Sequence, residues 1–70
     1  MPSNDEIPIR DQMSLAEYHR QVRQVLITIQ HCSTEHADSL MKEYESSMQE
    51  FYEEDYPQKL TAYGMVMHYL

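Results

Sequence analysis

Hydrophobic residues recur every three or four positions along most of the chain, which is the spacing of an α-helix that buries one face. The first such series comprises Leu15, Tyr18, Val22, Val25, Leu26 and Ile29. Ser14 precedes this series and Glu17 follows three positions later, which is the arrangement of a capping box at a helix N-terminus. The series therefore predicts an amphipathic helix over about residues 15–31.

A second hydrophobic series begins after a short polar turn. It comprises Ala37, Leu40, Met41, Tyr44, Met48, Phe51 and Tyr52. Ser33 or Thr34 is suited to cap this helix at its N-terminus. Pro57 disfavours a helical conformation for the residue before it, so the helix should end just upstream. We therefore expect a second helix over about residues 34–55.

A third, shorter series comprises Leu60, Tyr63, Val66, Met67 and Leu70. Pro57 suits the first position of a helix, because the N–H at that position has no partner within the helix. The pattern predicts a third helix over about residues 57–69.

These three helices place the chain in the all-α fold class. Only two or three residues separate the first two helices, so we expect them to form an antiparallel hairpin. The third helix is expected to pack across the hairpin, giving a small three-helix bundle over residues 13–70. Residues 1–12 are polar and contain Pro2 and Pro8, and they are predicted to form a flexible tail.

Association of two chains is a further way to bury the predicted apolar stripes. A core of this size rarely supplies more than about 3–5 kcal/mol, and small domains commonly add disulfides, a metal or a partner subunit. Cys32 is the only cysteine, so no disulfide can form within the chain. We therefore expect a homodimer in which two hairpins join into a larger bundle.

Composition narrows the expected cellular setting. A single cysteine is typical of a reducing compartment. The polar, acidic start of the sequence is unlike a secretory signal. No apolar run approaches the roughly 20 residues that cross a bilayer. We expect a cytoplasmic protein that does not enter a membrane.

The formal net charge of −7 is concentrated in one segment, because residues 33–55 carry eight acidic residues and one lysine. Direct binding of nucleic acid is not expected, since phosphate contacts need lysine and arginine. The predicted acidic surface comprises Glu43, Glu50, Glu53 and Glu54. Its plainest interpretation is the hydrated side of a helix, and its alternative is imitation of nucleic-acid charge.

Residue types that bind metals or act as nucleophiles gather at the predicted first turn, which contains His31, Cys32, Glu35 and His36. Cysteine and histidine are zinc ligands, but this set lacks the paired spacing that identifies a zinc site. A Cys–His nucleophile pair would also need an orienting group and a pocket that excludes water. We predict no metal, no cofactor and no enzyme activity.

Methionine and tyrosine are concentrated in the second half of the chain, in greater number than one short third helix can cover. Both residue types are common at protein interfaces. The residues predicted to contact a partner protein are Tyr52, Tyr56, Tyr63, Met67 and Tyr69. The leading hypothesis is a small acidic, non-enzymatic interaction module or regulator. The alternative is an acidic nucleic-acid mimic that inhibits a nucleic-acid-processing protein.

Overall fold

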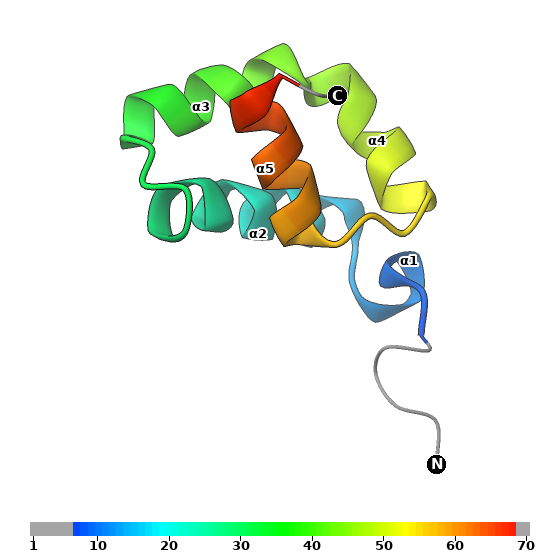
Figure 1. The fold of residues 1–70 in the computed structure, drawn as a ribbon. Coiled ribbons are helices and arrows are strands. Elements are labelled where there is room, and N and C mark those ends of the chain that lie inside the picture. Colours follow the sequence, from blue (N-terminus) through cyan, green and yellow to red (C-terminus); the bar gives the residue numbers. More distant parts are fainter. Residues whose placement is uncertain (1–6, 69–70) are drawn as a thin grey trace.

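The computed structural model describes residues 7–68, and every regular element in that range is an α-helix (Figure 1). The helices are α1 (Ile9–Gln12), α2 (Leu15–Thr28), α3 (Thr34–Glu43), α4 (Glu45–Glu53) and α5 (Gln58–Met67). Helix α2 is central, because α3, α4 and α5 all pack against it, while α1 packs on α4. The all-helical class predicted from the sequence is confirmed, with five helices in place of three.

Helix α2 begins where its sequence predicts. Ser14 has extended backbone angles, and its hydroxyl accepts a hydrogen bond from the backbone N–H of Glu17. The Glu17 carboxylate does not complete the capping box, because it accepts hydrogen bonds from Arg20 instead, with the Arg20 Nε 2.7 Å away. The N-terminus of α2 is therefore fixed by one of the two bonds that the sequence pattern predicts.

The end of α2 comes at Thr28, three residues before the predicted position. His31 adopts a left-handed conformation with a φ of 59°, which no helix interior accommodates. The N–H of Cys32 then donates to the carbonyl of Leu26 at 2.9 Å and closes the turn. The chain reverses here and enters α3, whose N-cap Ser33 accepts from the N–H of His36.

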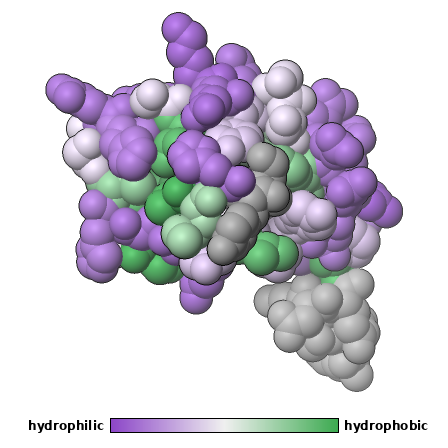
Figure 2. Space-filling view, turned by 45° about the horizontal axis from the view of Figure 1, so that its top comes forward, coloured by the Kyte–Doolittle hydropathy of each residue, from purple (hydrophilic) through white to green (hydrophobic). Residues whose placement is uncertain are grey.

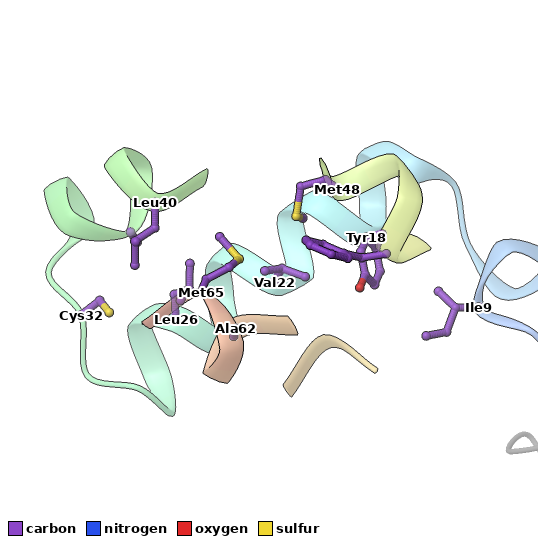
Figure 3. Packing of buried hydrophobic residues seen from close by; sticks show 11 residues of the cluster. Ile9, Tyr18, Val22, Leu26, Cys32, Leu40, Met48, Ala62 and Met65 are labelled. Atoms are coloured by element: carbon purple, nitrogen blue, oxygen red, sulfur yellow. The ribbon is translucent and has the colours of Figure 1, made fainter. Parts of the chain in front are cut away.

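The predicted helix over residues 34–55 is divided in two at Tyr44, which has a φ of −99° and a ψ of 11°. A straight helix of that span would be about 33 Å long against about 21 Å for α2, so its far end would extend past its partner. The bend turns α4 back across the end of α2, as Figure 1 shows. It brings Met48 beside Tyr18 in the core (Figure 3).

The predicted flexible tail over residues 1–12 needs correction at its C-terminal end. Residues 9–12 form α1, and Ile9 is only 7% exposed. The guanidinium of Arg10 donates to the carbonyl of Glu53 at 3.0 Å, which joins α1 to the end of α4. Burial of an isoleucine together with these long-range bonds outweighs the polar composition of the segment. Residues 1–6 lie outside the described residues.

The core is one contiguous cluster that draws on every helix (Figure 3). Its hydrophobic members are Ile9, Tyr18, Val22, Leu26, Cys32, Ala37, Leu40, Met48, Phe51, Ala62 and Met65. Full burial of a Val, Leu, Met or Phe side chain stabilises a fold by roughly 1.5–3 kcal/mol each. None of the described helices has the length and apolar character needed to cross a membrane.

Tyr18 makes two buried hydrogen bonds inside this core. Its side chain is fully buried, and its hydroxyl lies 2.8 Å from the carbonyl of Tyr56 and 2.7 Å from the hydroxyl of Thr61. The single phenolic proton is donated to the Tyr56 carbonyl, which can only accept, so the Thr61 hydroxyl donates to Tyr18. These two bonds hold α2 against the turn before α5 and against the first turn of α5.

A second set of contacts ends helix α4 at its C-terminus. Asp55 is left-handed with a φ of 63°, and the N–H of Tyr56 donates to the carbonyl of Phe51 at 3.0 Å. The rings of Phe51 and Tyr56 stack at 5.6 Å, which supplies the hydrophobic contact typical of this Schellman motif. The carboxylate of Asp55 also accepts from the N–H of Ile9 at 2.6 Å. One residue therefore ends α4 and anchors α1.

Alkaline pH should weaken the fold through Tyr18. Burial raises the pKa of the Tyr18 phenol above its ordinary value of 10.0, with Asp55 acting in the same direction and the Thr61 hydrogen bond opposing both. The folded state therefore holds this proton more tightly than the unfolded chain, and its stabilising effect is lost as pH rises above about 10. We expect the free energy of unfolding, measured in urea, to decline more steeply there for the wild type than for Tyr18→Phe. Parallel declines would contradict the prediction.

Substitutions at Asp55 should distinguish its two roles. One is to adopt the left-handed conformation that ends α4, and the other is to accept the hydrogen bond from the Ile9 N–H. Asn tolerates the left-handed conformation and keeps an acceptor for the Ile9 N–H, Gly keeps only the conformational tolerance, and Ala keeps neither. We expect stability in the order Asn, Gly, Ala, with Asp55→Ala losing about 1–3 kcal/mol of unfolding free energy in urea denaturation. An Ala variant as stable as the Asn variant would show that neither task matters.

Candidate interaction surface

Helix α5 presents an exposed apolar row on the side that faces away from the core. Leu60 is 52% exposed, Tyr63 is 45% exposed and Met67 is 46% exposed. Their spacing of three and four residues places them on one side of the helix. We call these three residues the α5 outer face. Figure 2 shows hydrophobic side chains gathered near the middle of its view, with hydrophilic side chains on either flank.

The opposite side of α5 is already committed to the fold. Thr61, Ala62 and Met65 are fully buried, and the most extensive packing of α5 is against α2. A short helix with apolar residues on both sides cannot bury them all against one neighbour. The α5 outer face is therefore apolar surface that the fold leaves uncovered, and Ile7 and Ile29 are the other exposed large hydrophobic residues within the described range.

The five residues predicted to contact a partner fall into different environments. Tyr52 is half-buried, and its hydroxyl donates within the fold, to the carbonyls of Arg10 at 3.1 Å and Met13 at 2.6 Å. Its ring also packs against that of Tyr18 at 5.6 Å. Tyr56 is half-buried and stacked on Phe51. Tyr52 therefore joins α4 to the N-terminal segment, and Tyr56 packs on the end of α4.

Tyr63 and Met67 are the members of the predicted set that lie on the α5 outer face, while Tyr69 lies outside the described residues. The structure adds Leu60, which the sequence pattern assigned to the apolar stripe without distinguishing its exposed position. The signal for it was present, because residues 60–67 are apolar at nearly every position. Binding of a partner by this set remains a prediction.

The predicted acidic surface spans both sides of the bend, with Glu43 on α3 and Glu50 and Glu53 on α4. These three side chains and Glu54 are exposed. The ion pairs found within residues 7–68 use other carboxylates, namely those of Glu17 and Asp38. None of the four predicted carboxylates forms an ion pair within residues 7–68, and that of Glu53 accepts a hydrogen bond from the side-chain amide of Gln49 at 3.1 Å.

A groove of about 310 Å³ opens between α2 and the start of α5. Its lining residues are Arg20, Gln21, Gln24, Val25, Gln58 and Lys59, and we call it the α2–α5 groove. The side-chain amide of Gln58 donates to that of Gln21 at 2.7 Å, which links the two walls. The lining combines two cations, three amides and one aliphatic side chain, and it contains no acidic residue.

The residues considered for metal or nucleophile chemistry are not brought together. Cys32 is buried at the end of α2, whereas His31 and His36 are exposed. Within the described part of the chain, no group of three or more His, Cys, Asp or Glu residues is placed to hold a metal ion.

Comparison with known proteins supplies no assignment. No family model, curated protein or solved structure matches the chain. The function is therefore argued from the residues of this chain alone.

Removing the Tyr52 hydroxyl should loosen α1 without disturbing the core. Tyr52→Phe keeps the ring contact with Tyr18 but loses the donor to two backbone carbonyls, so we expect about 1 kcal/mol less unfolding free energy. The amide of Met13, which donates to Ile9 at the end of α1, should exchange faster with solvent. Ser46→Ala, which removes an exposed hydroxyl from α4, is the control and should change stability by less than about 0.5 kcal/mol. Unchanged exchange at Met13 would contradict a structural role for Tyr52.

Proposed function

We propose that this protein is a small, non-enzymatic interaction module that binds a partner protein through the α5 outer face. The observation that carries the proposal is the row of three large apolar side chains, each about half exposed, on a helix whose other side is buried. Single exposed apolar residues are ordinary, whereas a contiguous row marks a surface that a partner covers.

The residue types of the α5 outer face support this proposal. Tyrosine offers a large ring with a polar end, and methionine adapts its shape to the surface that it meets. Both are enriched in interface cores relative to the rest of protein surfaces. Leucine adds apolar area beside them. This combination favours a hydrophobic contact with a polar rim, rather than a contact made by charge.

The position of α5 also supports the proposal. Its N-terminus is fixed by the Tyr18–Thr61 bond, and its inner side is held by Ala62 and Met65 in the core. A rigidly held helix loses little conformational entropy when a partner covers its outer side, so more of the contact energy appears as affinity. The exposed row is thus presented in a defined geometry.

A second copy of the chain is one partner that this proposal includes, in keeping with the expected homodimer. A symmetric contact through α5 would pair apolar rows of the same kind. It would also place two copies of α5 side by side, and this helix carries Lys59 and none of the acidic residues. The mass of the protein in solution distinguishes a self-contact from a contact with another protein.

An acidic inhibitor of a nucleic-acid-processing protein is the second candidate function. The observation that favours it is the set of exposed, unpaired carboxylates at Glu43, Glu50, Glu53 and Glu54. Such a surface attracts a basic channel by long-range electrostatics, and its binding weakens steeply as salt is added. An apolar contact through α5 depends far less on salt, so the two functions differ in a measurable way.

A photoreactive aromatic residue placed at position 63 should crosslink to the partner in the native host, whereas the same residue at position 49 on α4 should not. Leu60→Gln with Met67→Gln should reduce the crosslinked product at least tenfold, because truncating central apolar contacts costs more than about 1.4 kcal/mol. The exposed substitutions should change the unfolding free energy by no more than about 1 kcal/mol.

Two results would contradict the proposal. Equal crosslinking at positions 49 and 63 would show that α5 has no special role. Loss of the partner on changing Glu50, Glu53 and Glu54 to Gln, with the Leu60/Met67 variant unaffected, would favour the acidic inhibitor. A crosslinked product of twice the chain mass would identify the partner as a second copy.

A further inference from the structure

The α2–α5 groove adjoins the α5 outer face. Lys59 lines the groove, and Leu60, the next residue along the chain, begins the exposed apolar row. A partner that covers this row therefore meets the groove as well. The inference below rests on the proposed function and concerns the chemistry of the partner segment.

The charge of the groove differs from that of the rest of the molecule. Residues 33–55 carry eight acids and one lysine, for a charge of −7, whereas the groove is lined by Arg20 and Lys59 and by no acid. The carboxylate of Glu17 forms an ion pair with Arg20. Two cations against one carboxylate give the groove region a charge of +1 on a chain of net charge −7.

Polar groups in the groove match those of a peptide backbone. Each glutamine amide carries two donors and an acceptor, and Gln21, Gln24 and Gln58 all line the groove. The amide of Gln58 donates to that of Gln21 and also to the Met13 sulfur at 3.5 Å, and the amide of Gln21 donates to Glu17 at 3.5 Å. The side-chain carbonyl of Gln58 and one N–H of Gln21 are left for a ligand. Backbone N–H and C=O groups of an incoming segment would find partners here without displacing a buried bond.

Apolar contacts extend from the groove along both helices. Val25 forms part of the lining, and Ile29, one helical turn further along α2, is 45% exposed. On α5, Leu60 and Tyr63 follow Lys59 along the helix and are exposed. An occupant with apolar side chains among its charges is therefore favoured over a small anion.

We infer that the α2–α5 groove binds an acidic peptide segment of the partner, with a carboxylate of that segment near Lys59 and an apolar side chain on Val25 and Leu60. Opposite charges within about 4 Å attract even at a hydrated surface, although each exposed pair contributes only about 0.2–1 kcal/mol. The groove thus acts mainly as a selector of charge, and the apolar row supplies most of the affinity.

The acidic helices strengthen this selection. An acidic segment is repelled where it approaches the carboxylates of α3 and α4. At physiological salt, exposed charges further than about 8 Å away are largely screened, so this repulsion acts only at short range. Such a segment is therefore expected to bind at the α2–α5 groove, which is lined by cations and by no acidic residue. A basic segment would instead be drawn to α3 and α4.

A library of random 12-residue peptides displayed on phage tests the chemistry directly. Peptides selected on the full-length wild-type protein should be enriched in Asp and Glu and should carry at least one large apolar residue. A selected peptide, made synthetically, should shift the backbone NMR signals of Gln24, Val25 and Lys59 on binding. Selection of basic peptides, or of none above background, would overturn the inference.

Lys59→Gln and Lys42→Gln form a matched pair, because each removes one positive charge from an exposed position and only Lys59 lines the groove. Lys59→Gln should weaken the selected peptide about fivefold at low salt and flatten its salt dependence, whereas Lys42→Gln should leave both unchanged. Equal effects of the two variants would overturn the inference. Selected peptides that resemble residues 45–53, together with a dimeric mass in solution, would overturn it in favour of a second copy.

The two proposals fail separately. If Leu60→Gln with Met67→Gln abolishes the partner crosslink while Lys59→Gln leaves it unchanged, the interaction function stands and the acidic-segment inference falls. If neither variant affects the crosslink, the proposed function falls first.

Discussion

The hydroxyl of Tyr18 is the point on which the arrangement of the helices depends. A hydroxyl buried this deeply destabilises a fold unless both its donor and its acceptor capacity are used. Here the Tyr56 carbonyl and the Thr61 hydroxyl use both. Because those partners flank the start of α5, satisfying Tyr18 also fixes where α5 begins against α2. The direction of α5, and so the side that it turns to solvent, follows from this one buried group.

The same end of the molecule shows how a domain this small stabilises itself without a disulfide. Tyr52 packs on Tyr18 and donates to two carbonyls of the N-terminal segment, while Asp55 accepts from Ile9. Each bond contributes only about 0.5–1.5 kcal/mol on its own. Together they close one end of the core with α1, a helix too short to persist unaided. Long-range hydrogen bonds thus supply part of the support that composition led us to seek in a dimer.

Sequence reasoning succeeded where the determining interactions are local. The Ser14 cap needs only neighbours within a few residues and appears as predicted. Tyr18, Val22 and Leu26 of the predicted stripe are buried, whereas Ile29 lies beyond the end of α2 and is 45% exposed. The bend at Tyr44 was not predictable in this way, because no Gly or Pro marks it. The helical conformation of residues 9–12 was not predicted for a similar reason, since the N–H of Ile9 bonds to Asp55, 46 residues away.

The candidate surface shows the same limit. Tyr52 and Tyr63 look alike in the sequence, as tyrosines on amphipathic helices, yet Tyr52 is half-buried against the N-terminal segment and Tyr63 is 45% exposed on α5. Only the packing of α5 on α2 separates them. That packing also brings Arg20 and Lys59 to one groove, although each lies in a different predicted helix. Most of the acids lie on α3, α4 and the turn after α4, whereas Arg20 and Lys59 line the groove beside the exposed row. Under the two proposed functions a partner would meet chemically different surfaces, and binding through the carboxylates would depend on salt far more than binding through the apolar row.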